Sequence, residues 1–184
     1  MESLKNHFLI AMPMLNDPNF SEAVTYICQH SEEGAIGIVV NRPGSITIGE
    51  ICSQLDIGVT DGAQASSPVL TGGPVEPARG FVLHGESADY ESTISVSDEI
   101  HLTASRDILE AIAAGRGPSR AILALGYAGW GAGQLEAEIA ANAWLIVEAT
   151  AEIIFDTPYE ERWAAAANLI GIDIHEISNY SGHA

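Results

Sequence analysis

Basic residues are scarce in this chain. Its 184 residues include 7 Lys and Arg against 25 Asp and Glu, which gives a formal net charge of −18 at pH 7. Nucleic-acid-binding proteins neutralise phosphates with clustered Lys and Arg, and anionic membrane surfaces attract the same residues. The composition therefore argues against a nucleic-acid or membrane partner. It also excludes a Walker-type phosphate loop, because Lys5 is the only lysine.

Cysteines and long apolar runs are equally sparse. Cys28 and Cys52 are too few for a secreted disulfide scaffold, so we expect free buried thiols. The longest uncharged stretch, residues 121–135, is short and interrupted by glycines, which argues against a membrane span. The N-terminus lacks the basic start and the cleavage site of a signal peptide. These absences predict a cytoplasmic protein.

The remaining composition is that of one globular domain. Hydrophobic residues make up 47 % of the chain and charged residues 17 %, and 184 residues suffice for a core without disulfides or a structural metal. We expect residues 1–184 to form a single domain. Its most mobile part should be a polar, glycine-containing surface loop at about 58–67.

Local patterns predict a mixture of strands and helices. Apolar or alternating runs indicate strands at 8–12, 23–30, 35–40, 69–70, 80–84, 93–96, 100–103, 120–125 and 144–147. Capping signals and spacing indicate helices at 47–55, 105–115, 134–142 and 157–171. Hairpins dominate early and helices are interspersed later, which predicts an α+β fold with a mixed sheet.

The glycine-rich segment 126–133 is the most suggestive local feature. A strand, a glycine turn and a helix resemble a phosphate-binding junction, but the third glycine of the dinucleotide fingerprint is replaced by Gln134. We interpret the segment as a tight turn. Glu136 and Glu138 on the following helix either act as an acid–base pair or form a solvated face with a capping carboxylate.

Other catalytic constellations are weak. Cys28 and His30 lie on one strand face, so they form either an activated thiol pair or a buried thiol beside an unrelated histidine. The six histidines fall in no metal-ligand spacing, and a nucleophile elbow is absent. The sequence therefore contains no recognisable catalytic motif and predicts neither a cofactor nor a metal.

Scarce arginines and clustered aromatics supply the candidate binding residues. Arg42 and Arg79 stand among many acids, so each either pairs internally or holds an anionic ligand. Tyr127, Trp130 and Trp144 flank the glycines, where they either fill the core or mark a binding surface.

Several segments together resemble the YqgE/AlgH family of bacterial proteins. They are LKNHFLIAMP (4–13), DPNF (17–20), GAIGIVVNRP (34–43), GGP (72–74), RGFVLH (79–84), TASRD (103–107), LGYAGWGAGQLEAE (125–138) and NAWL (142–145). The resemblance implies an α+β fold with a bifurcated, partly barrel-like sheet surrounded by helices. The family carries the label of a transcriptional regulator and has no established catalytic residues, cofactor or substrate.

Two functional hypotheses follow. The first is a cytoplasmic regulatory or adaptor protein that acts through contacts with an unknown protein partner and does not bind DNA directly. The alternative is a small-molecule-binding protein or an enzyme with a pocket near residues 126–133. The polar and aromatic lining would then be Arg42, Arg79, His84, Tyr127, Trp130, Gln134 and Asn142.

Overall fold

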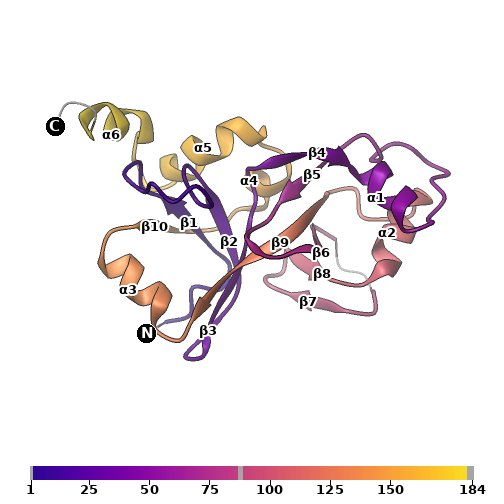
Figure 1. The fold of residues 1–184 in the computed structure, drawn as a ribbon, viewed down its shortest axis with the longest axis horizontal. Coiled ribbons are helices and arrows are strands. Elements are labelled where there is room, and N and C mark those ends of the chain that lie inside the picture. Colours follow the sequence, from indigo (N-terminus) through magenta and orange to yellow (C-terminus); the bar gives the residue numbers. More distant parts are fainter. Residues whose placement is uncertain (1, 87–88, 182–184) are drawn as a thin grey trace.

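The fold is seen in a computed structural model that describes residues 2–86 and 89–181, with the backbone alone for 178–181 (Figure 1). Residues 1, 87–88 and 182–184 of the predicted domain lie outside the described residues. The strands are β1 His7–Ala11, β2 Val24–Ser31, β3 Gly34–Val39, β4 Pro43–Thr47, β5 Pro68–Thr71, β6 Val75–His84, β7 Thr93–Ser95, β8 His101–Thr103, β9 Ala121–Gly131 and β10 Trp144–Glu148. The helices are α1 Ile48–Gln54, α2 Arg106–Ala113, α3 Gln134–Ala140, α4 Ala151–Phe155, the 3-10 helix η1 Tyr159–Glu161, α5 Arg162–Asn168 and α6 Ile174–Ser181.

The long strand β9 holds the sheet together. The strand order is β10-β1-β2-β3-β9-β6-β8-β7, and β4 and β5 branch off this path. Residues 128–131 of β9 pair antiparallel with β3, whereas residues 124–125 pair in parallel with β5. Most of the other half of β9 pairs antiparallel with β6. The sheet therefore splits along β9 and curls into a half-barrel with helices around it, as the α+β prediction and the resemblance implied (Figure 1).

Three glycines allow the connection between β5 and β6 to pass directly against β9. A Cβ atom on Gly72 would lie 2.4 Å from the carbonyl oxygen of Gly126, and one on Gly73 would lie 2.1 Å from the carbonyl carbon of Tyr127. Gly126 itself has φ of +80°. Because any side chain would overlap backbone atoms here, glycine is required for the crossing.

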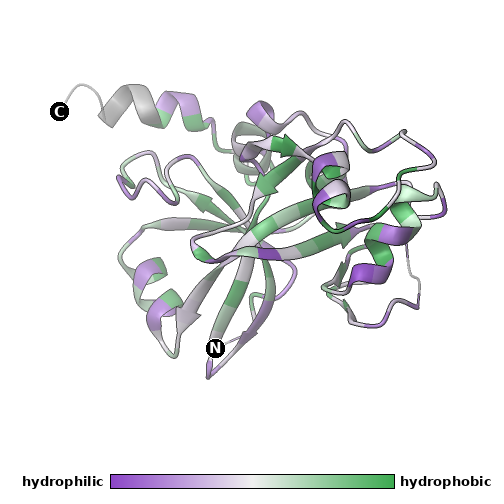
Figure 2. Ribbon diagram, turned by 45° about the vertical axis from the view of Figure 1, so that its right-hand side comes forward, coloured by the Kyte–Doolittle hydropathy of each residue, from purple (hydrophilic) through white to green (hydrophobic). Residues whose placement is uncertain are grey.

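The apolar side chains form three clusters. The largest fills the curl of the sheet and includes Phe8, Tyr26 and Phe81, with α4 and α5 packed on it. A second lies between α1, α2 and the β6–β9 side, and a third includes Trp130 and Trp144 beside α3. Figure 2 shows the corresponding pattern, with hydrophobic strands inside and hydrophilic residues on the outer helix faces.

Some predicted boundaries are wrong. The glycine-rich segment is not a turn throughout, because β9 continues to Gly131. Helices α4 and α6 were not predicted. The predicted helix at 157–171 is instead η1 followed by α5, since the Thr157 hydroxyl donates to the Glu152 carbonyl and does not cap the next helix.

Helix length bears on the membrane question. No helix in the described part of the chain is long and apolar enough to cross a bilayer.

Candidate functional site: a groove at the mouth of the half-barrel

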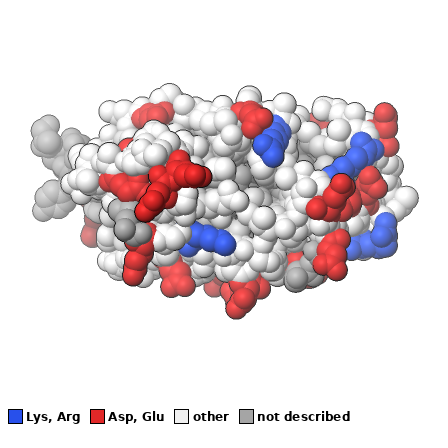
Figure 3. Space-filling view, turned by 90° about the horizontal axis from the view of Figure 1, so that it is seen from below, with Lys and Arg blue, Asp and Glu red and all other residues white. Residues whose placement is uncertain are grey.

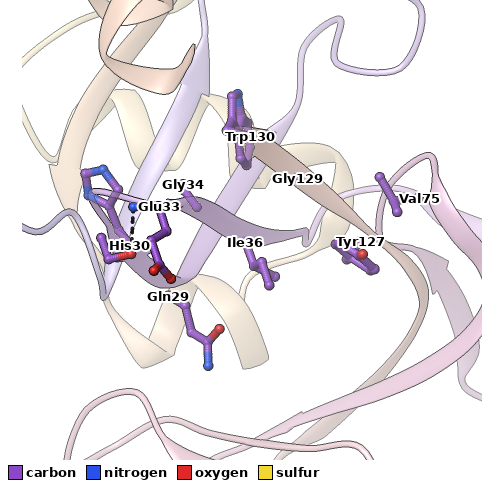
Figure 4. Close-up of a pocket in the computed structure, with 11 residues that line it drawn as sticks. Gln29, His30, Glu33, Gly34, Ile36, Val75, Tyr127, Gly129 and Trp130 are labelled. Atoms are coloured by element: carbon purple, nitrogen blue, oxygen red, sulfur yellow. Dashed lines mark hydrogen bonds between the residues drawn. The ribbon is translucent and has the colours of Figure 1, made fainter. Parts of the chain in front are cut away.

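Two adjoining cavities form a groove where the half-barrel opens. The first has a volume of about 650 Å³ and lies between the β2–β3 hairpin, the end of β9 and Val75 (Figure 4). The second, of about 440 Å³, lies between the same hairpin and β6, β7 and β8. Both are lined by Gln29, Ile36 and Tyr127. We therefore treat the two cavities as one feature and call it the mouth groove.

The mouth groove combines apolar and polar walls. In Figure 4, Trp130, Tyr127 and Val75 lie along one side, while His30, Glu33 and Gln29 lie on the other, with Ile36 between them. The second cavity adds Phe81, Ile94 and Leu102 together with Arg79 and Glu91. The outer face turned to the viewer in Figure 3 carries acidic groups toward both ends and along its lower edge, while its middle combines uncharged atoms with isolated basic groups.

Glycine at position 129 leaves space in the groove, because it has no side chain. A Cβ atom there would lie 3.5 Å from the Tyr127 ring and 3.8 Å from a Val75 methyl, which are ordinary contacts, and its φ lies outside the left-handed region. Gly34 differs, because its φ is +136° and a Cβ would lie 2.2 Å from the Trp130 carbonyl oxygen. The backbone thus requires glycine at 34, whereas at 129 glycine leaves space in the groove.

His30 is held in one tautomer on the groove wall. Its Nδ1 accepts from the backbone N–H of Leu4 at 2.8 Å, so the proton of the neutral ring is on Nε2, which donates to Glu136 at 2.6 Å. This hydrogen bond lowers the pKa of the Glu136 carboxyl. Both ring nitrogens are therefore occupied, and His30 fixes the N-terminal segment to α3.

Glu138 binds both tryptophans of the α3 side. Its Oε1 accepts from Nε1 of Trp130 at 3.1 Å and from Nε1 of Trp144 at 3.0 Å. Its Oε2 accepts from Gln134 at 3.0 Å, and the Gln134 amide oxygen accepts from the N–H of Gly131. The acid–base reading of the Glu136–Glu138 pair does not fit, because both carboxylates are bound by internal donors. Glu136 lies in the first turn of α3 and is bonded to backbone there, which agrees with the capping carboxylate of the other reading, whereas Glu138 positions the wall that carries Trp130.

The Cys28 thiol is buried at the base of the groove. Burial raises its pKa to about 12, and its Sγ lies 3.7 Å from the carbonyl oxygen of Tyr26. His30 is bound elsewhere and does not activate it. The structure therefore favours the buried-thiol alternative over the activated pair.

The structure brings some of the predicted binding residues together. Tyr127 and Trp130 line the first cavity, and Arg79 lines the second. Arg79 is 3.3 Å from Glu76 and lies over the Phe81 ring. Gln134 stands behind the groove wall through its bond to Glu138.

The other three candidates lie elsewhere in the fold. Arg42 donates to the carbonyls of Pro18, Asn19 and Ser21 and orders that loop. Asn142 follows α3 with φ of 62°, a left-handed position that asparagine tolerates.

His84 is fully buried on the opposite face of β6 from Phe81. Its Nδ1 donates to the Glu86 carbonyl at 2.8 Å, and its Nε2 pairs with the Thr103 hydroxyl at 2.7 Å. His101 lies beside it, with 5.5 Å between ring centroids. Burial lowers the pKa of His84; the hydrogen bond to the Glu86 carbonyl opposes this in part, and the nearby His101 adds a smaller lowering effect.

Sequence reasoning missed several groove residues. Gln29, Ile36, Val75 and Ile94 line the groove but carry no motif. Gln29 and Ile36 face each other across the β2–β3 hairpin. The signal in the sequence that could have found them is the alternation of side chains between the two faces of each strand. Among the described residues, no three His, Cys, Asp or Glu side chains converge as a metal centre requires.

A half-barrel sheet that splits along one long strand defines the class of fold, and solved structures share this fold. The solution structure of AlgH from Pseudomonas aeruginosa superposes with a TM-score of 0.81 at 46 % identity, over 96 % of this chain and 93 % of that one. A crystal structure of a protein from Corynebacterium diphtheriae gives a TM-score of 0.77 at 18 % identity, over 97 % of this chain and 93 % of that one, which shows the fold alone.

Sequence relatives identify the family. The AlgH-like signature matches residues 8–175. A UPF0301 protein of Saccharophagus degradans is 56 % identical over 99 % of this chain and 89 % of its own length. A UPF0301 protein of Xanthomonas campestris is 52 % identical over 98 % of this chain and 96 % of its own length. The chain belongs to the AlgH-like family.

Proposed function

We propose that this chain is a cytoplasmic regulatory adaptor that binds a segment of a protein partner in the mouth groove and does not contact DNA. The observation that carries the proposal is that the two cavities adjoin and share the lining residues Gln29, Ile36 and Tyr127, so together they extend further along the mouth of the half-barrel than either does alone. Elongated grooves with apolar floors and polar rims suit peptide segments.

The side chains of the groove are arranged for binding. Both ring nitrogens of His30 are taken, and the Cys28 thiol has a raised pKa, so neither is poised to act on a substrate. Gly129 supplies space where the backbone does not require glycine. Glycine in a strand costs roughly 0.5–1 kcal/mol relative to alanine, so binding is a reason to keep it.

Charge supports a protein partner over a duplex. Glu33 and Glu91 line the groove, and Arg79 is paired with Glu76. With a net charge of −18, the chain repels phosphates. A salt-dependent gel shift by the tag-free protein at sub-micromolar concentration would overturn this part of the proposal.

The test is site-specific photo-crosslinking in cells. A crosslinking amino acid replaces Val75 in the groove or, as a control, the exposed Val59 outside it. We expect a protein adduct from position 75 and none from 59. The adduct should disappear in Gly129→Val, which fills the groove, and persist in Gly58→Val, where a Cβ meets nothing within 4 Å.

The mass of the adduct separates the two functional classes. A protein-sized adduct that depends on Gly129 supports the adaptor proposal. An adduct of small-molecule mass favours the alternative, because a cavity of about 650 Å³ is also of the size that holds small ligands. An adduct that survives Gly129→Val, or none at position 75, would show that the groove is not the binding site.

A further inference from the structure

We propose that the partner segment is an extended, basic chain that adds as a strand to the free edge of β7. This inference rests on the proposed function and names the chemistry of the partner. Three observations carry it: an unpaired strand edge, its position beside the groove, and the charge of the groove.

The edge of β7 is open in the described part of the structure, where β8 is its one hydrogen-bonded neighbour. The N–H of Val96 donates to the Ile100 carbonyl, and the N–H of Ala104 donates to the Ser92 carbonyl. Antiparallel bonding alternates, so Ile94 makes the next bonded pair with β8. The backbone N–H and C=O groups of Thr93 and Ser95 therefore point away from β8, toward the open side.

This edge lies at the groove. Residues 91–94 line the second cavity, opposite Gln29 and Ile36 of the hairpin. Ile94 is 37 % exposed and, with Phe81 and Leu102, forms apolar floor next to the edge. A strand paired with Thr93 and Ser95 would place alternate side chains on that floor, which is how sheets take up peptides.

The charge along the groove selects a basic segment. Glu33 lies in the first cavity and Glu91 in the second, both exposed. The one arginine of the second cavity, Arg79, already has Glu76 as its partner. Lysine or arginine side chains that alternate with apolar ones would meet these carboxylates while the apolar ones reach the floor.

The test uses defined peptides and the full chain. Fluorescent peptides that alternate valine with lysine or arginine are titrated by anisotropy, beside a charge-reversed valine–glutamate peptide and a basic peptide N-methylated at alternate residues. N-methylation removes the strand hydrogen bonds and keeps the side chains. We expect the basic peptide to bind in the micromolar range and both controls to bind at least about tenfold more weakly.

A protein variant tests the same edge from the other side. Ser95→Pro removes an outward N–H without removing a bond to β8, and proline is tolerated on strand edges. Ser95→Ala is the matched control, because both variants lose the hydroxyl that bonds His101 at 2.9 Å. We expect Ser95→Pro to weaken binding about tenfold and Ser95→Ala to leave it within about threefold.

The outcomes are distinct. Equal binding of the N-methylated peptide, equal binding by Ser95→Pro and Ser95→Ala, or no binding of the basic peptide at millimolar concentration each overturns strand addition. If a protein adduct still forms at position 75, the groove proposal survives this failure. If it does not, both fail together.

Discussion

Removing the Glu138 carboxylate should destabilise the wall of the mouth groove. Trp130 and Trp144 are only 6 % and 4 % exposed, and both indole N–H groups donate to Glu138. In Glu138→Ala both donors lose their acceptor inside the protein. A buried donor left without a partner costs about 1–3 kcal/mol, so the variant should lose about 2–6 kcal/mol of unfolding free energy.

A graded variant separates the hydrogen bonds from the charge. In Glu138→Gln one oxygen can still accept from both indoles, but the new amide faces the amide of Gln134, so two donors meet. We expect a smaller loss, about 1–2 kcal/mol. Glu148→Ala is the control, because Glu148 is exposed in β10 and surface substitutions usually stay within about 0.5 kcal/mol.

The assay is urea unfolding followed by tryptophan fluorescence and by far-UV circular dichroism. Fluorescence reports on Trp130 and Trp144 together with the third tryptophan, Trp163 of α5, and dichroism reports on the whole sheet. For a chain of this size each kcal/mol lowers the melting temperature by about 2–4 °C, so Glu138→Ala should also melt clearly earlier. A Glu138→Ala variant as stable as Glu148→Ala would refute the role assigned to this carboxylate.

Three further predictions concern other parts of the fold. The lowered pKa of His84 means that the folded state resists its protonation, so the stability it contributes is present above the unfolded value of 6.5 and is lost as pH falls through the lower folded value. Unfolding titrations across this range should show the loss, and His84→Asn should remove that part of it. Neither Cys28 nor Cys52 should react with a thiol reagent at pH 8 in the native protein, since burial raises both pKa values, whereas both should react in urea; rapid native labelling of Cys28 would contradict its burial. Gly72→Ala should cost about 3 kcal/mol or prevent folding, because its Cβ would meet the Gly126 carbonyl oxygen, while Gly129→Ala should stabilise the fold by about 0.5–1 kcal/mol in thermal melts, because its Cβ would make only ordinary contacts.

Capping patterns in the sequence predicted a helix correctly where one N-cap hydrogen bond fixes the start of that helix. The Thr47 hydroxyl accepts from the N–H of Glu50, as the capping pattern indicated, and α1 follows. The same pattern at Thr157 failed, because α4 ends just before it and its hydroxyl satisfies the Glu152 carbonyl of that helix. The apolar run of α4 resembles a strand, and its helical form depends on packing into the curl of the sheet.

The glycines at 126–133 misled the prediction for a related reason. Glycines usually mark turns, but here Gly129 and Gly131 lie within β9, where β3 pairs with both. What requires or permits a glycine is the approach of a segment far away in the chain, as Gly73 approaches Gly126. That information is absent from the local sequence.

The candidate site was predictable only in part. Tyr127 and Trp130 stand out as aromatics beside glycines, and both line the groove. Gln29 and Val75 reach the same groove because β9 pairs with β3 and with β6, which are far from it in the chain. Such long-range pairings cannot be recognised from the residues around each position. Arginine scarcity pointed to Arg42, yet its three carbonyl partners lie in one nearby loop.

The central position of β9 has a consequence for the newly made chain. Strands on both sides of the split pair with residues 121–131, so neither half can close its sheet before this segment has left the ribosome. Until then β3, β5 and β6 each have one unpaired edge, and unpaired strand edges can associate with those of other nascent chains. We therefore expect a chain truncated before Ala121 to need chaperones or to aggregate, and the interval between synthesis of β3 and β9 to be the most vulnerable period of this protein's biogenesis.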